Sequence, residues 1–315
     1  MTSYLVRRFF LMLLTLVGMS IVIFLLLRLM PGNIADIMFD SAGFVDPAEK
    51  AALEKELGLD LPIPVQYWEW ISALVVGDLG FSYVSEMPAI DEIGPRIPIT
   101  VKLAIMALGF SVLFGLPLGV ISAVRQDTPL DYVLRVISLS GLSLPSFWLA
   151  LLILMAFVTY LGEIPIYTDP PDNLWDELLL YTIPAAAVGF RASAIIMRLT
   201  RSSMLEVLRQ DYIRTARSKG ATDNSVNYYH ALKNAVLPVT TIIGFEAAFL
   251  IGGLIITETV FNIPGVAHFL VEAILMRDYP IVQNLVMFIA VVVVLINFIV
   301  DLLYAVLDPR IKYAE

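Results

Sequence analysis

Residues 9–27 read FFLMLLTLVGMSIVIFLLL and carry no charged side chain. A bilayer core about 30 Å thick is crossed by about 20 mostly apolar residues in a helix, so this stretch predicts a membrane span. A cleaved export signal has a shorter apolar region followed by a small-residue cleavage site. Here the run is longer, and Met30-Pro31-Gly32-Asn33 follows it. We therefore interpret residues 9–30 as a retained first span.

Five more apolar runs follow along the chain. They cover residues 103–124, 136–162, 178–197, 234–257 and 279–300. The fourth span of the chain contains one charge, Arg191, and the fifth contains one charge, Glu246. The whole chain is 59% hydrophobic and 16% charged, with a mean hydropathy of +0.83. These values exclude an ordinary soluble domain and a disordered chain. The sequence predicts an all-α integral membrane protein with six transmembrane helices.

The basic residues near the span ends predict the orientation. One side of the membrane receives 13 of them and the other side receives 4. The first group is Arg7, Arg8, Arg125, Arg135, Arg198, Arg201, Arg209, Arg214, Arg217, Lys219, Lys233, Arg310 and Lys312; the second is Lys50, Lys55, Arg96 and Arg277. Because cytoplasmic loops carry the excess of Lys and Arg, both termini are expected in the cytoplasm of a multi-pass cell-membrane protein.

Several classes of site are disfavoured by composition. The chain has no cysteine and only two histidines, His230 and His268, so we expect no metal site and no cofactor. No segment matches the phosphate-binding G-x-x-x-x-G-K-[ST] loop, so any ATPase is another polypeptide. Intramembrane serines have no histidine at similar depth, which argues against an enzyme. The net charge of -9 argues against nucleic acid as a partner. A secondary transporter remains an alternative, although no halves of matching pattern are visible.

The long outer loop, about residues 31–98, has one clear local signal. Asp46 is expected to cap a helix that begins at Pro47 and stops at Gly58. Tyr67 to Trp70 then suggest a segment at the headgroup level, where Trp and Tyr are enriched.

The segment between spans four and five is the most informative. It reads TRSSMLEVLRQDYIRTARSKGATDNSVNYYHALKNAVLP over residues 200–238, and we call it the elbow. We predict a helix over 204–219 that ends at Gly220, where a positive φ is allowed. A second helix is expected to be capped by Asp223 and to end before Pro238.

Several motifs of this chain resemble one family. The run DYIRTARSKGA…HALKNAVLP is similar to the loop signature of importer permeases of the ATP-binding-cassette class, in particular the dipeptide/oligopeptide/nickel subfamily. The resemblance continues in Met30-Pro31-Gly32, in Glu258-Thr259-Val260-Phe261 with Pro264-Gly265, and in Asp308-Pro309-Arg310. One departure from the signature is that Arg214-Thr215 stands where the signature has Glu-Ala.

The resemblance implies a type I importer permease fold and a set of partners. These are a second homologous permease subunit, two cytoplasmic ATPases and an extracytoplasmic substrate-binding protein. It implies that the elbow docks on an ATPase and transmits its closure through Arg214, Thr215, Ala216, Gly220, Leu237 and Pro238. The chain would divide into residues 1–98, a first helix with its long outer loop, and residues 99–315, a five-helix core with the coupling loop at about 200–236. Di- or oligopeptides are the expected cargo, and nickel chelates and oligosaccharides are alternatives within the family.

The two charges inside spans four and five fall at similar depth. Arg191 is about 20 Å below the outer end of its span, and Glu246 is about 15 Å above the inner end of its span, at 1.5 Å per residue. A lone charge at mid-bilayer is costly, so pairing is expected. We therefore predict either an Arg191–Glu246 ion pair or a shared water-filled path where both residues meet cargo.

Overall fold

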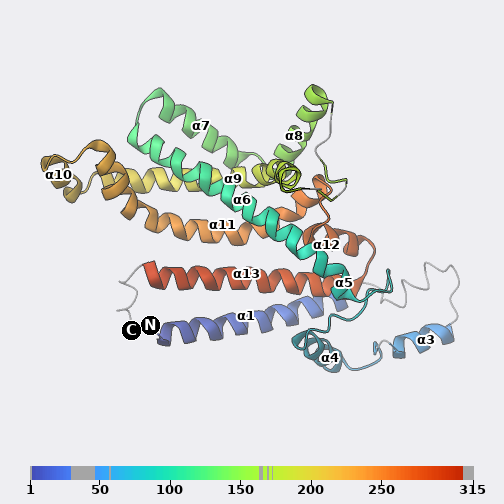
Figure 1. The fold of residues 1–315 in the computed structure, drawn as a ribbon. Coiled ribbons are helices and arrows are strands. Elements are labelled where there is room, and N and C mark those ends of the chain that lie inside the picture. Colours follow the sequence, from blue (N-terminus) through green and yellow to red (C-terminus); the bar gives the residue numbers. More distant parts are fainter. Residues whose placement is uncertain are drawn as a thin grey trace.

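The computed structural model describes residues 2–29, 47–56, 58–162, 166–168, 170–171 and 173–307. The regular structure in these residues is almost entirely helical (Figure 1). The helices run α1 (Thr2–Arg28), α3 (Pro47–Glu56), α4 (Ile63–Val75), α5 (Ala89–Ile93), the 3-10 turn η1 (Gly94–Arg96), α6 (Ile97–Val124), α7 (Pro129–Ser143), α8 (Ser146–Leu161), α9 (Leu174–Leu208), α10 (Asp211–Ser218), the π-helix η2 (Ser225–Ala231), α11 (Leu232–Val260), α12 (Val266–Leu275) and α13 (Tyr279–Leu307).

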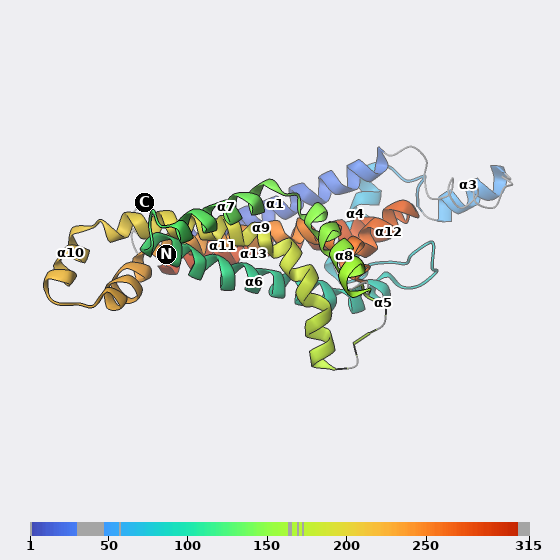
Figure 2. The same cartoon turned by 90° about the horizontal axis from the view of Figure 1, so that it is seen from above.

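Within the described residues, five stretches are long and apolar enough to cross a membrane. They are Leu5–Arg28, Ala89–Val124, Leu174–Leu208, Ser225–Val260 and Tyr279–Leu303. Figures 1 and 2 show them running side by side, with α10 and both described chain ends at one end of the bundle and α3, α4 and α12 at the other. The five runs that the sequence marked as 9–27, 103–124, 178–197, 234–257 and 279–300 lie inside these stretches.

The third predicted span along the chain, residues 136–162, is not one continuous helix. Residues 136–162 fall on α7 and α8, which are bent by 107° at the break between them. Leu144 there has extended backbone (φ -84°, ψ 126°), and Pro145 follows it. A proline pushes the residue before it out of the α region, which explains the bend. The described part of the chain therefore contains six candidate spans only if this bent pair is counted as one.

The prediction of one helix over 204–219 is wrong. Helix α9 continues to Leu208, Gln210 is extended (ψ 150°), and α10 begins at Asp211. The break turns Ile213 back onto the bundle, where it is fully buried with Met204 and Val226. Burial of that side chain outweighs the local preference for a continuous helix.

The second elbow helix also differs from the prediction. It begins after Thr222, whose hydroxyl accepts a hydrogen bond from the Ser225 N–H at 3.4 Å, so the cap lies one residue before Asp223. It does not end before Pro238, which lies inside α11. Ala235 and Val239 on either side of this proline are buried, and membrane helices tolerate proline where neighbouring groups compensate for the lost hydrogen bond.

Helix α9 is the centre of the bundle, and α6 packs directly against it. The approach is close because of glycines: a Cβ on Gly119 would lie 2.6 Å from the Met197 carbonyl oxygen, and one on Gly189 would lie 2.6 Å from the Ala107 carbonyl oxygen. Small residues allow backbones to approach in this way in membranes. Helix α1 packs on α13 at the side of the bundle (Figure 1).

The predicted outer-loop helix is present as α3, and Gly58 after it has a φ of +65°, as expected for a helix stop. Asp46, its expected cap, lies outside the described residues, as do the Met30-Pro31-Gly32 and Asp308-Pro309-Arg310 motifs.

Candidate functional site

The elbow projects beyond the other helices at the end of the bundle that holds both described chain ends (Figures 1 and 2). Its tip is α10, which ends at Ser218 and is followed by Gly220 with a φ of +85°. The Gly220 N–H donates to the Arg217 carbonyl at 2.9 Å, and the Ala221 N–H donates to the Ala216 carbonyl at 3.2 Å. This pair of bonds is the Schellman helix stop, which needs a residue with positive φ. The geometry at Gly220 is the one predicted from the sequence.

One face of α10 is attached to the bundle and the other is exposed. Ile213 packs in a cluster with Val120 of α6, Met204 of α9 and Ala235 of α11. Ala216 is half-buried against the same cluster. The elbow tip is therefore in contact with the ends of three spans.

The predicted coupling residues divide into two groups. Arg214, Thr215 and Gly220 are exposed on the elbow tip, and Arg214 pairs with Asp211 at 3.5 Å. Leu237 and Pro238 are exposed too, but they lie within α11, beyond η2, and the structure does not bring them to α10. A side-chain hydrogen bond still joins α10 to α11, because the Tyr212 hydroxyl accepts from the Asn234 amide at 2.7 Å.

A buried carboxylate at the base of the elbow, that of Asp131, was not predicted from the sequence. Asp131 of α7 is fully buried and binds Arg201 of α9 through two bonds, Nε–Oδ1 at 2.8 Å and Nη2–Oδ2 at 2.9 Å. It also accepts from the Ser122 hydroxyl at 2.5 Å and from the Asp127 N–H at 3.0 Å. This cluster joins α6, α7 and α9. The spacing of Thr128 and Asp131 is a helix-start signal, but nothing local pointed to Arg201.

The two mid-span charges are close to each other. Arg191 Nη1 lies 3.5 Å from Glu246 Oε2, at the edge of hydrogen-bond range. The side chains are 35% and 11% exposed, respectively. The Arg191 guanidinium also lies 4.3 Å from the centre of the Phe249 ring, a cation–π contact. The geometry is compatible with both predicted roles, because Arg191 pairs with Glu246 while about a third of its side chain stays exposed.

The Glu258 motif organises the opposite end of the bundle. The Glu258 carboxylate is fully buried, and it accepts from the Thr100 hydroxyl at 2.7 Å and from the N–H groups of Ala267 and His268, both at 2.9 Å. The last two bonds satisfy free N–H groups at the start of α12. The sequence singled out Glu258 as a family marker, whereas its capping role became visible only in the structure.

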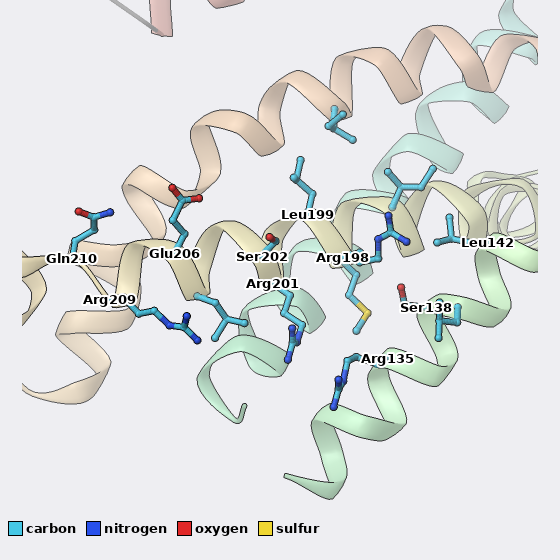
Figure 3. A pocket seen from close by; sticks show the side chains of 15 residues that line it. Arg135, Ser138, Leu142, Arg198, Leu199, Arg201, Ser202, Glu206, Arg209 and Gln210 are labelled. Atoms are coloured by element: carbon cyan, nitrogen blue, oxygen red, sulfur yellow. The ribbon is translucent and has the colours of Figure 1, made fainter. Parts of the chain in front are cut away.

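A concavity with a volume of about 980 Å³ lies between α7 and α9 (Figure 3). It is lined by arginines from both helices, by Leu139 and Leu142 of α7, and by Ile242 of α11. Among the residues that the structure describes, no group of three His, Cys, Asp or Glu side chains is arranged to hold a metal ion.

Comparison with known proteins places this geometry in a family. Residues 115–313 match the model of the binding-protein-dependent transport system inner membrane component, and residues 1–104 match the model of the N-terminal part of such membrane components.

Curated relatives align over nearly the whole chain. The dipeptide transport system permease protein DppB of Alkalihalophilus pseudofirmus is 41% identical over 335 positions, covering 99% of this chain and 100% of the relative. The dipeptide permease DppB of Escherichia coli K12 is 37% identical with full coverage of both chains. The glutathione transport system permease protein GsiC of Pectobacterium atrosepticum is 37% identical, covering 99% of this chain and 100% of the relative.

Two solved structures share the fold. An amino acid ABC transporter is 15% identical with a TM-score of 0.56, covering 72% of this chain and 99% of its own. The MetNI methionine ABC transporter in an inward-facing conformation is 17% identical with a TM-score of 0.58, covering 70% of this chain and 98% of its own. The fold is therefore that of ABC importer permeases. With its apolar spans and its two family matches, this chain belongs to the inner-membrane components of binding-protein-dependent transport systems and is a multi-pass membrane protein.

Proposed function

We propose that this chain is the first of two related permease subunits of an ATP-driven importer for di- and oligopeptides. The observation that carries the proposal is the full-length likeness to two permeases named for dipeptide transport, at 41% and 37% identity. Another relative is named for glutathione, which is itself a small peptide. Peptide cargo is thus better supported than nickel chelates or oligosaccharides.

The proposal assigns the rest of the machine to other chains. Two cytoplasmic ATPases supply the energy, an extracytoplasmic binding protein delivers the cargo, and this chain performs no catalysis. The end of the bundle with α10 faces the cytoplasm, in keeping with the 13-to-4 distribution of basic residues. Residues 1–98 form the first span with its outer loop, and residues 99–315 form the transport core.

The elbow is the element proposed to receive the ATPase movement. Its tip presents Arg214, Thr215 and the turn at Gly220 to the partner, while Ile213 holds the tip against the ends of α6, α9 and α11. A displacement of α10 is therefore passed to packed helices, because close-packed interiors transmit strain. Leu237 and Pro238 belong to this proposal as part of the first turns of α11, which follow the elbow tip.

The Arg191–Glu246 contact connects α9 and α11 inside the membrane. Helix α9 precedes α10 in the chain and α11 follows it, and the two spans contact each other through this pair. A charge at this depth faces the bundle interior or a water-filled cavity. We propose that the pair holds the two spans together and borders the transport path.

The test is reconstitution of the complete importer in vesicles. The chain, its second permease, its ATPases and its binding protein are combined, and uptake of a labelled dipeptide is measured with and without ATP. ATP-dependent uptake that requires the binding protein supports the proposal. Uptake by this chain without the ATPases, driven by an ion gradient, would instead identify a secondary transporter. Mass spectrometry of the ligand that the purified binding protein retains distinguishes peptide from chelate or oligosaccharide cargo.

A further inference from the structure

The groove between α7 and α9 carries an excess of positive charge. Four arginines line it, namely Arg135, Arg198, Arg201 and Arg209 (Figure 3). Two carboxylates stand against them: Glu206, which lines the groove, and Asp131, which binds Arg201. Four positive and two negative charges leave a net charge of +2 in this region.

The arginines of the groove are incompletely paired. The Asp131 oxygens already accept from Arg201, and Arg135 Nε lies 3.6 Å from Asp131 Oδ2, too far for a hydrogen bond. Arg135 Nε and Nη2 are buried and have no hydrogen-bond partner among the described residues. Arg198 and Arg209 are exposed and form no ion pair within the part of the chain that the structure describes.

A row of polar residues on one face of α9 runs from the groove toward the middle of the membrane. Arg191, Arg198, Ser202 and Arg209 follow one another at spacings of seven, four and seven residues, and we call this row the α9 lane. Arg198, Ser202 and Arg209 are exposed, whereas the residues on the other side of α9 are buried. Arg198 lies about 10 Å from Arg191 along the helix axis. Ile242, one turn before Glu246 on α11, also lines the groove.

The depth of Arg191 decides which side of the molecule this face belongs to. Charged side chains at mid-membrane face the bundle interior or water and not the acyl chains. Because Arg191 and the groove arginines share one face of α9, the groove lies on the side of α9 that faces the bundle interior or water. This separates it from a surface that lipid covers.

We propose that the groove is the cytoplasmic half of the transport path and binds the carboxylate of the cargo peptide as it passes. Guanidinium groups form strong charge-assisted hydrogen bonds with carboxylates, and every peptide with a free C-terminus carries one. Arginines spread along the α9 lane offer successive weak sites, which suit conduction better than one deep site. This inference rests on the proposed peptide cargo and adds the chemical group that the path recognises.

The first experiment measures the charge of the groove without relying on transport. Ser202→Cys introduces the only thiol of this chain, on the α9 lane between Arg198 and Arg209. In the assembled importer, its labelling rate is compared for a sulfonate-bearing and a trimethylammonium-bearing methanethiosulfonate. Arg198→Gln or Arg209→Gln should lower the anionic-to-cationic rate ratio by about fourfold each, because one unit charge about 10 Å away in a water-like dielectric changes each rate about twofold, in opposite directions for the two reagents. Arg125→Gln removes an exposed charge outside the groove and should leave the ratio unchanged.

The second experiment measures recognition of the carboxylate. Uptake of alanyl-alanine and of its C-terminal amide is compared in the reconstituted importer. The same binding protein serves every variant, so its own preference cancels when variants are compared with wild type. Arg198→Gln together with Arg209→Gln should lower the carboxylate-to-amide uptake ratio by about tenfold. Arg198→Lys in place of Arg198→Gln, with Arg209→Gln kept, preserves the charge at position 198 and should restore most of the ratio.

Three results would overturn the inference. The first is an unchanged carboxylate-to-amide uptake ratio in the arginine variants while the wild-type importer still takes up peptide. This result leaves the proposed function standing, whereas absence of peptide uptake by the wild-type importer refutes the proposed function itself. Ser202→Cys that is protected only by anionic phospholipid in the vesicles identifies a lipid site. Ser202→Cys that reacts in the isolated chain but with neither reagent in the importer identifies a contact between subunits.

Discussion

The cluster around Asp131 gives a stability prediction that can be worked from its contacts. Asp131→Ala removes the carboxylate that neutralises Arg201, whose side chain is only 19% exposed. Removing one partner of a buried ion pair costs about 3–5 kcal/mol, because the other charge stays behind without compensation. The Ser122 hydroxyl and the Asp127 N–H lose their acceptor as well. In a large domain about 1 kcal/mol corresponds to about 2 °C in Tm, so the melting temperature should fall by about 6–10 °C.

The assay is thermal unfolding of the purified complex in one fixed detergent, followed by size-exclusion chromatography with fluorescence detection. The matched control is Asp211→Ala, which breaks an exposed pair with Arg214 and should change the Tm by no more than about 1 °C. The double variant Asp131→Leu with Arg201→Met removes both charges and should recover much of the loss. A Tm change below about 2 °C for Asp131→Ala, or a double variant as unstable as the single one, would refute the reasoning.

The remaining predictions concern the elbow, the orientation and the mid-span pair. Gly220→Val places a β-branched residue at a φ of +85°, which costs about 1–3 kcal/mol locally. The variant should insert into the membrane normally but lose peptide-stimulated ATP hydrolysis. Normal stimulation of ATP hydrolysis would contradict the coupling role. Ser85→Cys should react with an impermeant thiol reagent added outside cells and Ser218→Cys should not, and the reverse pattern would invert the orientation. Arg191→Ala or Glu246→Ala should lower abundance or uptake, and the swap Arg191→Glu with Glu246→Arg should restore part of it. If the swap is as defective as the single variants while these remain abundant, the pair has no structural role.

Sequence patterns predicted the elements whose cause is local. Uncharged runs of about 20 residues predicted the spans because membrane thickness sets that length. Gly220 and Gly58 marked helix stops because few other residues take a positive φ. The depth of Arg191 and Glu246 along their helices was enough to predict their proximity, and the two side chains lie 3.5 Å apart.

The features that were missed depend on contacts between distant parts of the chain. The break at Gln210 follows from the burial of Ile213 against Val120, which lies about 90 residues earlier. Pro238 was expected to end a helix by its own chemistry, but the packing of its neighbours in the membrane prevailed. Arg201 looked like one of many basic residues on the cytoplasmic side, and only the folded chain identifies it as the partner of Asp131.

The π-helix η2 at the root of α11 has a consequence for the register of that span. A π-helical turn bonds residue i to i+5, whereas an α-helical turn bonds i to i+4, so each π turn holds one extra residue. One residue corresponds to about 100° of rotation about a helix axis. Conversion of Ser225–Ala231 to α geometry would therefore swivel α11, with Glu246 on it, against α10 without breaking the chain of hydrogen-bonded turns. By the same arithmetic, one residue deleted within η2 should be absorbed there, whereas one deleted within α11 would turn its buried side outward.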